Sequence, residues 1–136
     1  MKLFKNKKGI TLVELLAVLV ILGIIAAIAV PTVNTLITNT RARADVESAN
    51  SYVQAARLFA LENLGENNTV VVTNGALEDY VSNNVEFTST VFFTVVDGSI
   101  STITSTGLNT NTETANGTPI QRGTGPNDNT FERRPE

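Results

Sequence analysis

An uninterrupted apolar run, residues 10–30 (ITLVELLAVLVILGIIAAIAV), constrains the fold of this chain more than any other feature. The run has 21 residues, among them one charged side chain, Glu14, and one hydroxyl, Thr11. A helix of about 20 residues, rising about 1.5 Å per residue, spans the ~30 Å hydrocarbon core of a membrane. Four lysines lie in the first eight positions and predict a cytoplasmic N-terminus. The run therefore predicts one membrane-spanning helix, with the rest of the chain outside.

Two ordinary kinds of segment share this pattern. A secretory signal peptide has a basic start, a shorter apolar run and a small-x-small cleavage site, which Ala27-Ile28-Ala29 would provide. A permanent single-pass anchor accounts for the length of the run. The corresponding alternatives are a secreted binding module that begins at Val30 and an anchored monomer, but neither explains an acid within the run.

Glu14 is the residue that needs an explanation. An ionised carboxylate in hydrocarbon is costly, so such groups tend to be paired and functional. No basic residue follows Glu14 within the apolar run. Cleavage after Gly9 would create one partner, the α-amino group of Ile10, on the same helix or on a neighbouring copy. Alternatively, Glu14 lies at the headgroups beside the lysines and reaches water there, and charge alone does not separate the two.

The residues around this acid closely resemble the signal of type IV pilins and their pseudopilin relatives, which is a short basic leader, a glycine, a fixed glutamate and an apolar run to a proline. The family usually has Phe where this chain has Ile10, although Ile also occurs there. The residues that carry the resemblance are Lys7, Lys8, Gly9, Ile10, Thr11, Leu12, Val13, Glu14 and Pro31.

The resemblance implies a structural protein and no enzyme. A membrane-embedded prepilin peptidase would remove the leader, residues 1–9, between Gly9 and Ile10 and then N-methylate Ile10. Glu14 would pair with the α-amine of an adjacent subunit, and residues 10–30 would form the core of a helical homopolymer.

The resemblance also implies partners and a location. The partners would be other copies of the chain, the peptidase, and a pilus or secretion assembly platform in the inner membrane. The precursor would cross the cytoplasmic membrane once, and the product would be an extracellular filament for adhesion, motility or related surface functions. The alternative within the family is a pseudopilin of a type II secretion or competence DNA-uptake apparatus.

Residues 31–64 predict a helix that continues beyond the membrane. Pro31 lacks an N–H, so we expect a kink just before it. Apolar residues then recur at steps of three and four, which is typical of an amphipathic helix. They are Val46, Ala49, Val53, Ala56, Ala60 and Leu64, with Asn50, Gln54, Arg57 and Leu61 on the other side. A single helix over residues 10–64 would be about 80 Å long, which suits a subunit whose first half packs against other copies.

Four charged residues near the start of this amphipathic segment allow two interpretations. Arg41 and Arg43 face Asp45 and Glu47. They are either ordinary short-range ion pairs on a solvated helix surface or charges matched between subunits along a filament.

Residues 65–104 predict a small antiparallel β head. Residues 91–96 and 99–104 are rich in β-branched and aromatic residues and flank Asp97-Gly98, a type I′ hairpin signal. Residues 70–72 are candidates for a strand or an extended loop, residues 85–88 for a third strand, and residues 77–81 for one or two helical turns. The side chains expected to cover the helix are Phe93, Val95, Ile100 and either Ile103 or Phe87. The fold class is therefore α+β: a long kinked helix, with a transmembrane first half, packed on a three- or four-stranded sheet.

Residues 105–136 form a Thr/Asn/Gly-rich C-terminal segment. Its large apolar residues are Leu108, Ile120 and Phe131. Such a composition buries too little to offset chain entropy. We expect a loop or a disordered tail, with at most an edge strand near residues 118–121.

The composition also limits the chemistry. The chain has no Cys and no His, which excludes disulfides, thiolate or imidazole metal sites and Ser-His nucleophile pairs. Without residues 1–9, six basic and 13 acidic residues give a net charge of −7, so direct nucleic-acid binding is not expected. Glu78, Asp79 and Asp97 are the candidate calcium ligands, but no loop supplies the six to eight oxygens that calcium takes. We therefore expect no catalytic residue, metal or cofactor.

Overall fold

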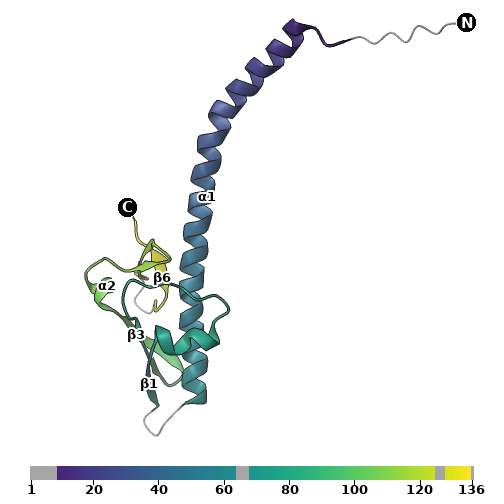
Figure 1. The fold of residues 1–136 in the computed structure, drawn as a ribbon. Coiled ribbons are helices and arrows are strands. Elements are labelled where there is room, and N and C mark those ends of the chain that lie inside the picture. The colour runs from purple at the N-terminus through teal and green to yellow at the C-terminus, as the bar shows by residue number, and fades with distance from the viewer. Residues whose placement is uncertain (1–8, 64–67, 125–127, 136) are drawn as a thin grey trace, which may run out of the picture. The chain divides into compact units, whose positions relative to one another are not determined.

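The computed structural model describes residues 9–63, 68–124 and 128–135. One long helix is followed by short antiparallel strands, so the predicted α+β class is confirmed (Figure 1). Contacts within the chain define two compact units, Met1–Asn39 and Thr40–Glu136, and each is described by itself.

Helix α1, Leu12–Glu62, has 51 residues and confirms the prediction of a helix through most of residues 10–64. Pro31 lies inside it. The hydroxyl of Thr32 donates to the Ile28 carbonyl at 3.0 Å, and that of Thr35 donates to the Pro31 carbonyl at 3.1 Å. These threonines satisfy their hydroxyls within the helix itself. The kink at Pro31 stays a prediction.

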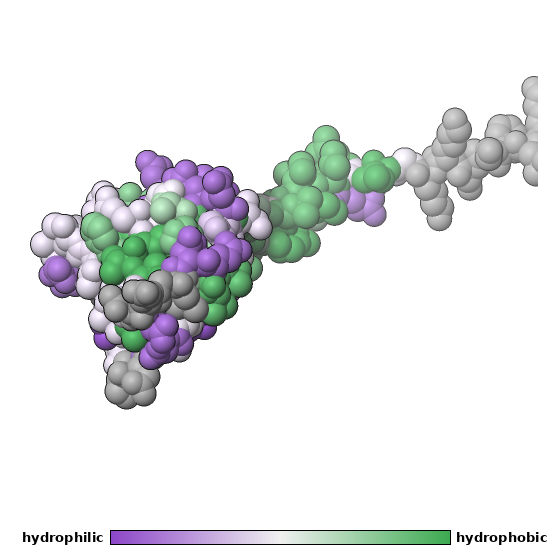
Figure 2. Space-filling view, turned by 90° about the horizontal axis from the view of Figure 1, so that it is seen from below, coloured by the Kyte–Doolittle hydropathy of each residue, from purple (hydrophilic) through white to green (hydrophobic). Residues whose placement is uncertain are grey.

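The part of α1 that precedes Thr40 is covered with exposed apolar side chains. From Ile10 to Ile37, every large hydrophobic residue is between 43% and 81% exposed. The visible part of this segment is largely hydrophobic in the space-filling view (Figure 2). The helix is long and apolar enough to cross a membrane.

The first sheet contains the predicted hairpin. Strand β2 (Phe92–Val96) pairs antiparallel with β3 (Ser99–Thr104), and β1 (Thr69–Thr73) pairs with the other edge of β2. Asp97 and Gly98, which connect β2 to β3, have φ of 50° and 75°, as a type I′ turn requires.

Two further predictions for the head turn out differently. The expected helical turn is a 3-10 helix, η1 (Asn74–Tyr80), which begins three residues earlier than expected. The expected strand over residues 85–88 is reduced to a single bridge between Phe87 and Ala115. The partner of β2 is instead the segment that contains residues 70–72.

The C-terminal segment corrects the expectation of a loop or disordered tail. It contains a short helix, α2 (Thr106–Asn109), and a second antiparallel sheet, ordered β4-β5-β6, whose strands are β4 (Thr114–Ala115), β5 (Thr118–Arg122) and β6 (Phe131–Arg133). Ile120 and Phe131 are only 1% and 2% exposed. Two large apolar side chains are enough to order this segment because they enter a core that the rest of the head already provides.

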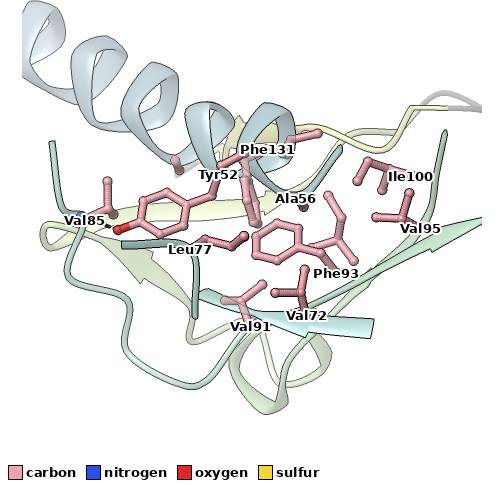
Figure 3. Close-up of a cluster of buried hydrophobic side chains, with 14 of the residues drawn as sticks. Tyr52, Ala56, Val72, Leu77, Val85, Val91, Phe93, Val95, Ile100 and Phe131 are labelled. Atoms are coloured by element: carbon pink, nitrogen blue, oxygen red, sulfur yellow. Dashed lines mark hydrogen bonds between the residues drawn. The ribbon is translucent and has the colours of Figure 1, made fainter. Parts of the chain in front are cut away.

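The core of the head lies between α1 and the sheets (Figure 3). The predicted helix positions Ala49, Val53, Ala56 and Ala60 are all buried, and Leu64 lies outside the described residues. Phe93 faces this stripe from β2 and packs edge-on against Phe131, with ring centroids 6.2 Å apart. The remaining predicted core residues Val95, Ile100 and Ile103 are also buried, and Phe87 packs against the cluster.

Tyr52 is a core residue that the periodicity did not mark. It is 1% exposed, and its phenolic oxygen accepts a hydrogen bond from the Val85 N–H at 3.1 Å. Its ring meets Phe87 edge-on at 5.2 Å. A tyrosine can occupy this position because its polar tip finds a backbone donor inside the core.

Two polar side chains of α1 hold the second sheet. Asn50, which the helical pattern placed on the outer side, donates to the Phe131 carbonyl at 3.0 Å and accepts from the Phe131 N–H at 2.7 Å. Asp45 accepts from the Thr118 hydroxyl at 2.6 Å and from the Asn116 side-chain amide at 3.3 Å. The placement of Asn50 on the outer side is therefore wrong, because its amide reproduces the paired bonds of a neighbouring strand.

Candidate functional site: the N-terminal segment around Glu14

Thr11 and Glu14 start helix α1 by capping each other. The Glu14 N–H donates to the Thr11 hydroxyl oxygen at 3.2 Å. The Thr11 N–H and hydroxyl both donate to Oε2 of Glu14 at 3.0 Å. This is a capping box, which satisfies backbone donors that the first helical turn leaves free. Its Thr-x-x-Glu spacing was readable in the sequence, and the interpretation of Glu14 as an unpaired acid missed it.

The capping box gives Glu14 a role within its own chain. A carboxylate at the N-terminus of a helix is also stabilised by the helix dipole. Among the residues that the structure describes, Oε2 accepts both bonds from Thr11 and Oε1 accepts none. Oε1 therefore stays available to a further donor, which the pairing with an α-amine requires.

The predicted cleavage site lies just outside the helix. Gly9 and Ile10 are exposed, have no helical or strand assignment, and precede the helix start at Leu12. A Cβ built on Gly9 meets nothing within 4 Å, and its φ is not in the left-handed region. The fold of the chain itself therefore does not require glycine at this position. Lys7 and Lys8, the expected leader residues, lie outside the described residues.

The four charges near the start of the head do not form the expected ion pairs. Asp45 is taken by Thr118 and Asn116, as described above. Neither guanidinium group of Arg41 and Arg43 has a partner within residues 9–63, 68–124 and 128–135, and both side chains are exposed. Asp45 therefore does not form the short-range ion pair with an arginine of the same helix that the sequence allowed, because it binds Thr118 and Asn116 instead.

The acidic side chains of the described residues do not converge on a metal site. Within the described residues, no group of three or more Asp, Glu, His or Cys side chains is arranged to hold a metal ion. The candidate ligand Asp97 lies in the hairpin turn, whereas Glu78 and Asp79 lie on η1.

Comparison with known proteins identifies the N-terminal segment. Residues 4–30 match the model of the prokaryotic N-terminal methylation motif. No curated protein and no solved structure matches the chain. Residues 4–30 therefore carry the prepilin-type cleavage and methylation signal of the type IV pilin family.

The match, together with the apolar helix, defines a class of protein. It supports a membrane-anchored precursor of the type IV pilin or pseudopilin kind, whose signal implies processing by a prepilin peptidase. The motif points to a structural subunit and not to an enzyme.

Proposed function

We propose that this chain is a structural subunit that is cleaved after Gly9, N-methylated at Ile10 and polymerised into an extracellular filament. The methylation motif at residues 4–30 is the observation that carries the proposal. The motif ends inside a helix whose exposed apolar surface has to be covered by lipid before assembly and by other copies afterwards.

The free energy of assembly would come mainly from this surface. Each Leu, Ile or Val side chain that passes from exposed to buried contributes about 1.5–3 kcal/mol relative to water. A subunit in the membrane has already removed these side chains from water, so their transfer from lipid to the filament adds little hydrophobic free energy. Tight packing and polar pairing between helices must therefore favour the filament. The Ile10 amine and Glu14 would supply such a pair and set the axial register between neighbouring helices.

The first experiment is to read the mature N-terminus by mass spectrometry of purified protein. We expect a chain that begins at Ile10 with one added methyl group, and Gly9→Leu should leave the leader uncut. A chain that begins at Val30 would instead indicate a secreted module, and an uncut chain that still forms filaments would contradict the proposal. Electron microscopy of cells separates a long surface filament from the short assembly of a pseudopilin.

Glu14→Ala tests the charge pair. The variant should insert into the membrane normally, because removing a carboxylate makes the segment more apolar. The yield of sheared filaments should fall at least about tenfold, since the amine of the neighbouring copy loses its partner. Glu14→Gln is the matched control for the capping box, because a glutamine can still accept from Thr11 but carries no charge. Filament yields for Glu14→Gln that equal the wild type would contradict the charge pair.

A further inference from the structure

Arg41 and Arg43 lie in one turn of α1 at the start of the head, on either side of the buried Ala42. They are the first charged residues after Glu14, at the end of 26 uncharged residues. Asp45, the nearest acid in sequence, already accepts hydrogen bonds from two side chains of the second sheet. Within the described parts of the chain the two arginines are exposed and without a partner. Their charge is therefore available to another molecule.

An acidic surface lies at the opposite end of the head along α1. Glu62 is the last residue of α1 and accepts a hydrogen bond from the Tyr80 hydroxyl at 2.7 Å. Phe59 packs edge-on against the Tyr80 ring at 5.6 Å, so η1 lies against this end of the helix. Asp79 is exposed beside Tyr80 and close enough for its charge to act on the phenol. The carboxylates of Glu62 and Asp79 thus share one exposed site.

A groove leads into this acidic surface. One wall is α1 from Ala44 to Leu58, and the other is the segment Tyr80 to Asn83. Leu58, which lines this groove, remains 54% exposed although it belongs to the part of α1 that packs on the head. Side chains such as Leu58 and Tyr80 beside carboxylates suit arginine, whose stem packs on apolar and aromatic surface while its guanidinium binds acids.

The arginine turn and the acidic surface cannot pair within one head. Arg41 and Glu62 are 21 residues apart on the same continuous helix, a separation of about 31 Å. Complementary surfaces at the two ends of a molecule instead favour head-to-tail contact between copies, which generates an open filament. If a second copy is shifted by about 31 Å parallel to α1, the arginine turn of one copy lies next to the acidic surface of the other. The same shift lets the N-terminal helices of the two copies pack side by side.

We propose that the turn Arg41–Arg43 of one copy docks at this groove of a second copy, with the Arg43 guanidinium group on Glu62 and Asp79. The inference rests on the proposed filament and names the contact that joins successive heads. Its occupant is a second copy of this chain, because the charges are complementary and the contact continues the apolar interface of α1.

Engineered cysteines test the contact directly, because the chain has none of its own. In filaments of the full-length processed chain, Arg43→Cys with Asp79→Cys should oxidise to a ladder of linked subunits on a non-reducing gel. Arg43→Cys with Ser101→Cys is the control, since Ser101 is exposed on β3 away from the groove lining. Filaments that form normally but give no ladder, or the same ladder for both pairs, would overturn the contact and leave the proposed function intact.

Charge reversal provides an independent test. Arg41→Glu with Arg43→Glu should lower the sedimentable fraction about threefold to tenfold at low salt, and the loss should shrink as salt screens the charges. Adding Glu62→Arg and Asp79→Arg should restore assembly, which also shows that the variants fold. No loss in the reversed variant, or no recovery in the swapped one, would overturn the proposal.

Two other outcomes are informative. If the wild type forms no filament, the proposed function fails. Cross-linking of Arg43→Cys with Asp79→Cys is then measured on the protein in membranes, and the absence of a cross-link there overturns the contact as well. If the arginines bind lipid headgroups instead, Arg41→Glu with Arg43→Glu should weaken retention only in vesicles that contain anionic lipid, and the cysteine pair should give no ladder. That result would overturn a contact between copies.

Discussion

Glu14 and Glu113 show how residue environment decides what a carboxylate does. Glu14 caps a helix in a segment that has to enter an apolar phase, and it accepts hydrogen bonds from the N–H and the hydroxyl of Thr11. Glu113 is fully buried in the head, where Ser89 donates to it through its N–H at 3.1 Å and through its hydroxyl, and Ser105 donates at 2.7 Å. Buried acids of this kind are stable only when they are hydrogen-bonded.

Gly107 makes room for the Glu113 carboxylate. A Cβ at Gly107 would lie 3.0 Å from the Glu113 Cα, a backbone atom, and would clash with Oε2 of the same residue. We predict that Gly107→Ala destabilises the head by about 1–3 kcal/mol, because a packed core resists an added methyl group. Denaturant unfolding of the full chain in detergent, followed by tyrosine fluorescence, measures the change.

Gly75→Ala is the control for this measurement. A Cβ at Gly75 meets nothing within 4 Å and the residue is not in the left-handed region. Its unfolding midpoint should stay close to that of the wild type. If both variants lost the same stability, the close approach at Gly107 would not be the cause.

Among the residues of the head that the structure describes, Tyr80 is the titratable group whose pKa is clearly perturbed. Its hydrogen bond to Glu62, then partial desolvation, then the charges of Glu62 and Asp79 raise its pKa above the ordinary value of 10.0. The folded head therefore favours the protonated phenol. The associated stabilisation is present below pH 10 and is lost as the pH rises through the raised pKa.

Glu62→Gln should lower the pKa of Tyr80 toward its ordinary value. The measurement is the ultraviolet absorbance of the phenolate during an alkaline titration, with Tyr80→Phe subtracted to isolate this tyrosine. An unchanged titration midpoint in Glu62→Gln would show that the hydrogen bond does not perturb the phenol.

At the scale of elements, the head is built from two small sheets that depend on one helix. The hairpin β2–β3 has local turn chemistry to define it, whereas β6 has three residues and pairs with one strand, β5, among the described residues. Asn50 compensates, because its side-chain amide on α1 gives the backbone of β6 a second set of hydrogen-bond partners. A side chain of the helix thus acts in place of a neighbouring strand.

Asn50→Ala should destabilise the head by about 1–3 kcal/mol. The substitution leaves the N–H and carbonyl of Phe131 without their partners in a half-buried site. Hydrogen exchange should show faster exchange at the Phe131 amide in particular. Gln54→Ala, a change of an exposed amide one turn further along α1, is the control and should leave that exchange rate unaltered.

At the scale of the whole molecule, one core joins segments that are far apart in the sequence. Phe131 packs with Phe87 and Phe93, which places the C-terminal strand in contact with both sheets of the head. The C-terminal segment is therefore part of the folding unit. The residues before Thr40 form the other unit, whose apolar side chains remain for lipid or for other copies.

Phe131→Ala should cost the head about 3–5 kcal/mol, which is the usual effect of removing a buried phenylalanine side chain. For a head of this size that is a large fraction of the total stability. Phe92→Ala provides the comparison, because Phe92 is 42% exposed on β2 of the first sheet. Thermal unfolding of both variants should separate them clearly, and equal losses would contradict a core role for the C-terminal segment.

The sequence alone was enough to predict the long helix, the β2–β3 hairpin and the signal around Glu14. Each depends on neighbouring residues: an apolar run, a turn that needs positive φ, and a motif of fixed spacing. The capping box belongs with them, since Thr11 and Glu14 are three residues apart.

Only the tertiary structure decided the rest. The roles of Asn50, Tyr52 and Glu113, and the order of the C-terminal segment, depend on partners that are distant in the sequence. A polar or Thr-rich segment has no local pattern that marks it as folded. Its order comes from a few side chains, above all Ile120 and Phe131, which enter a core that other segments build.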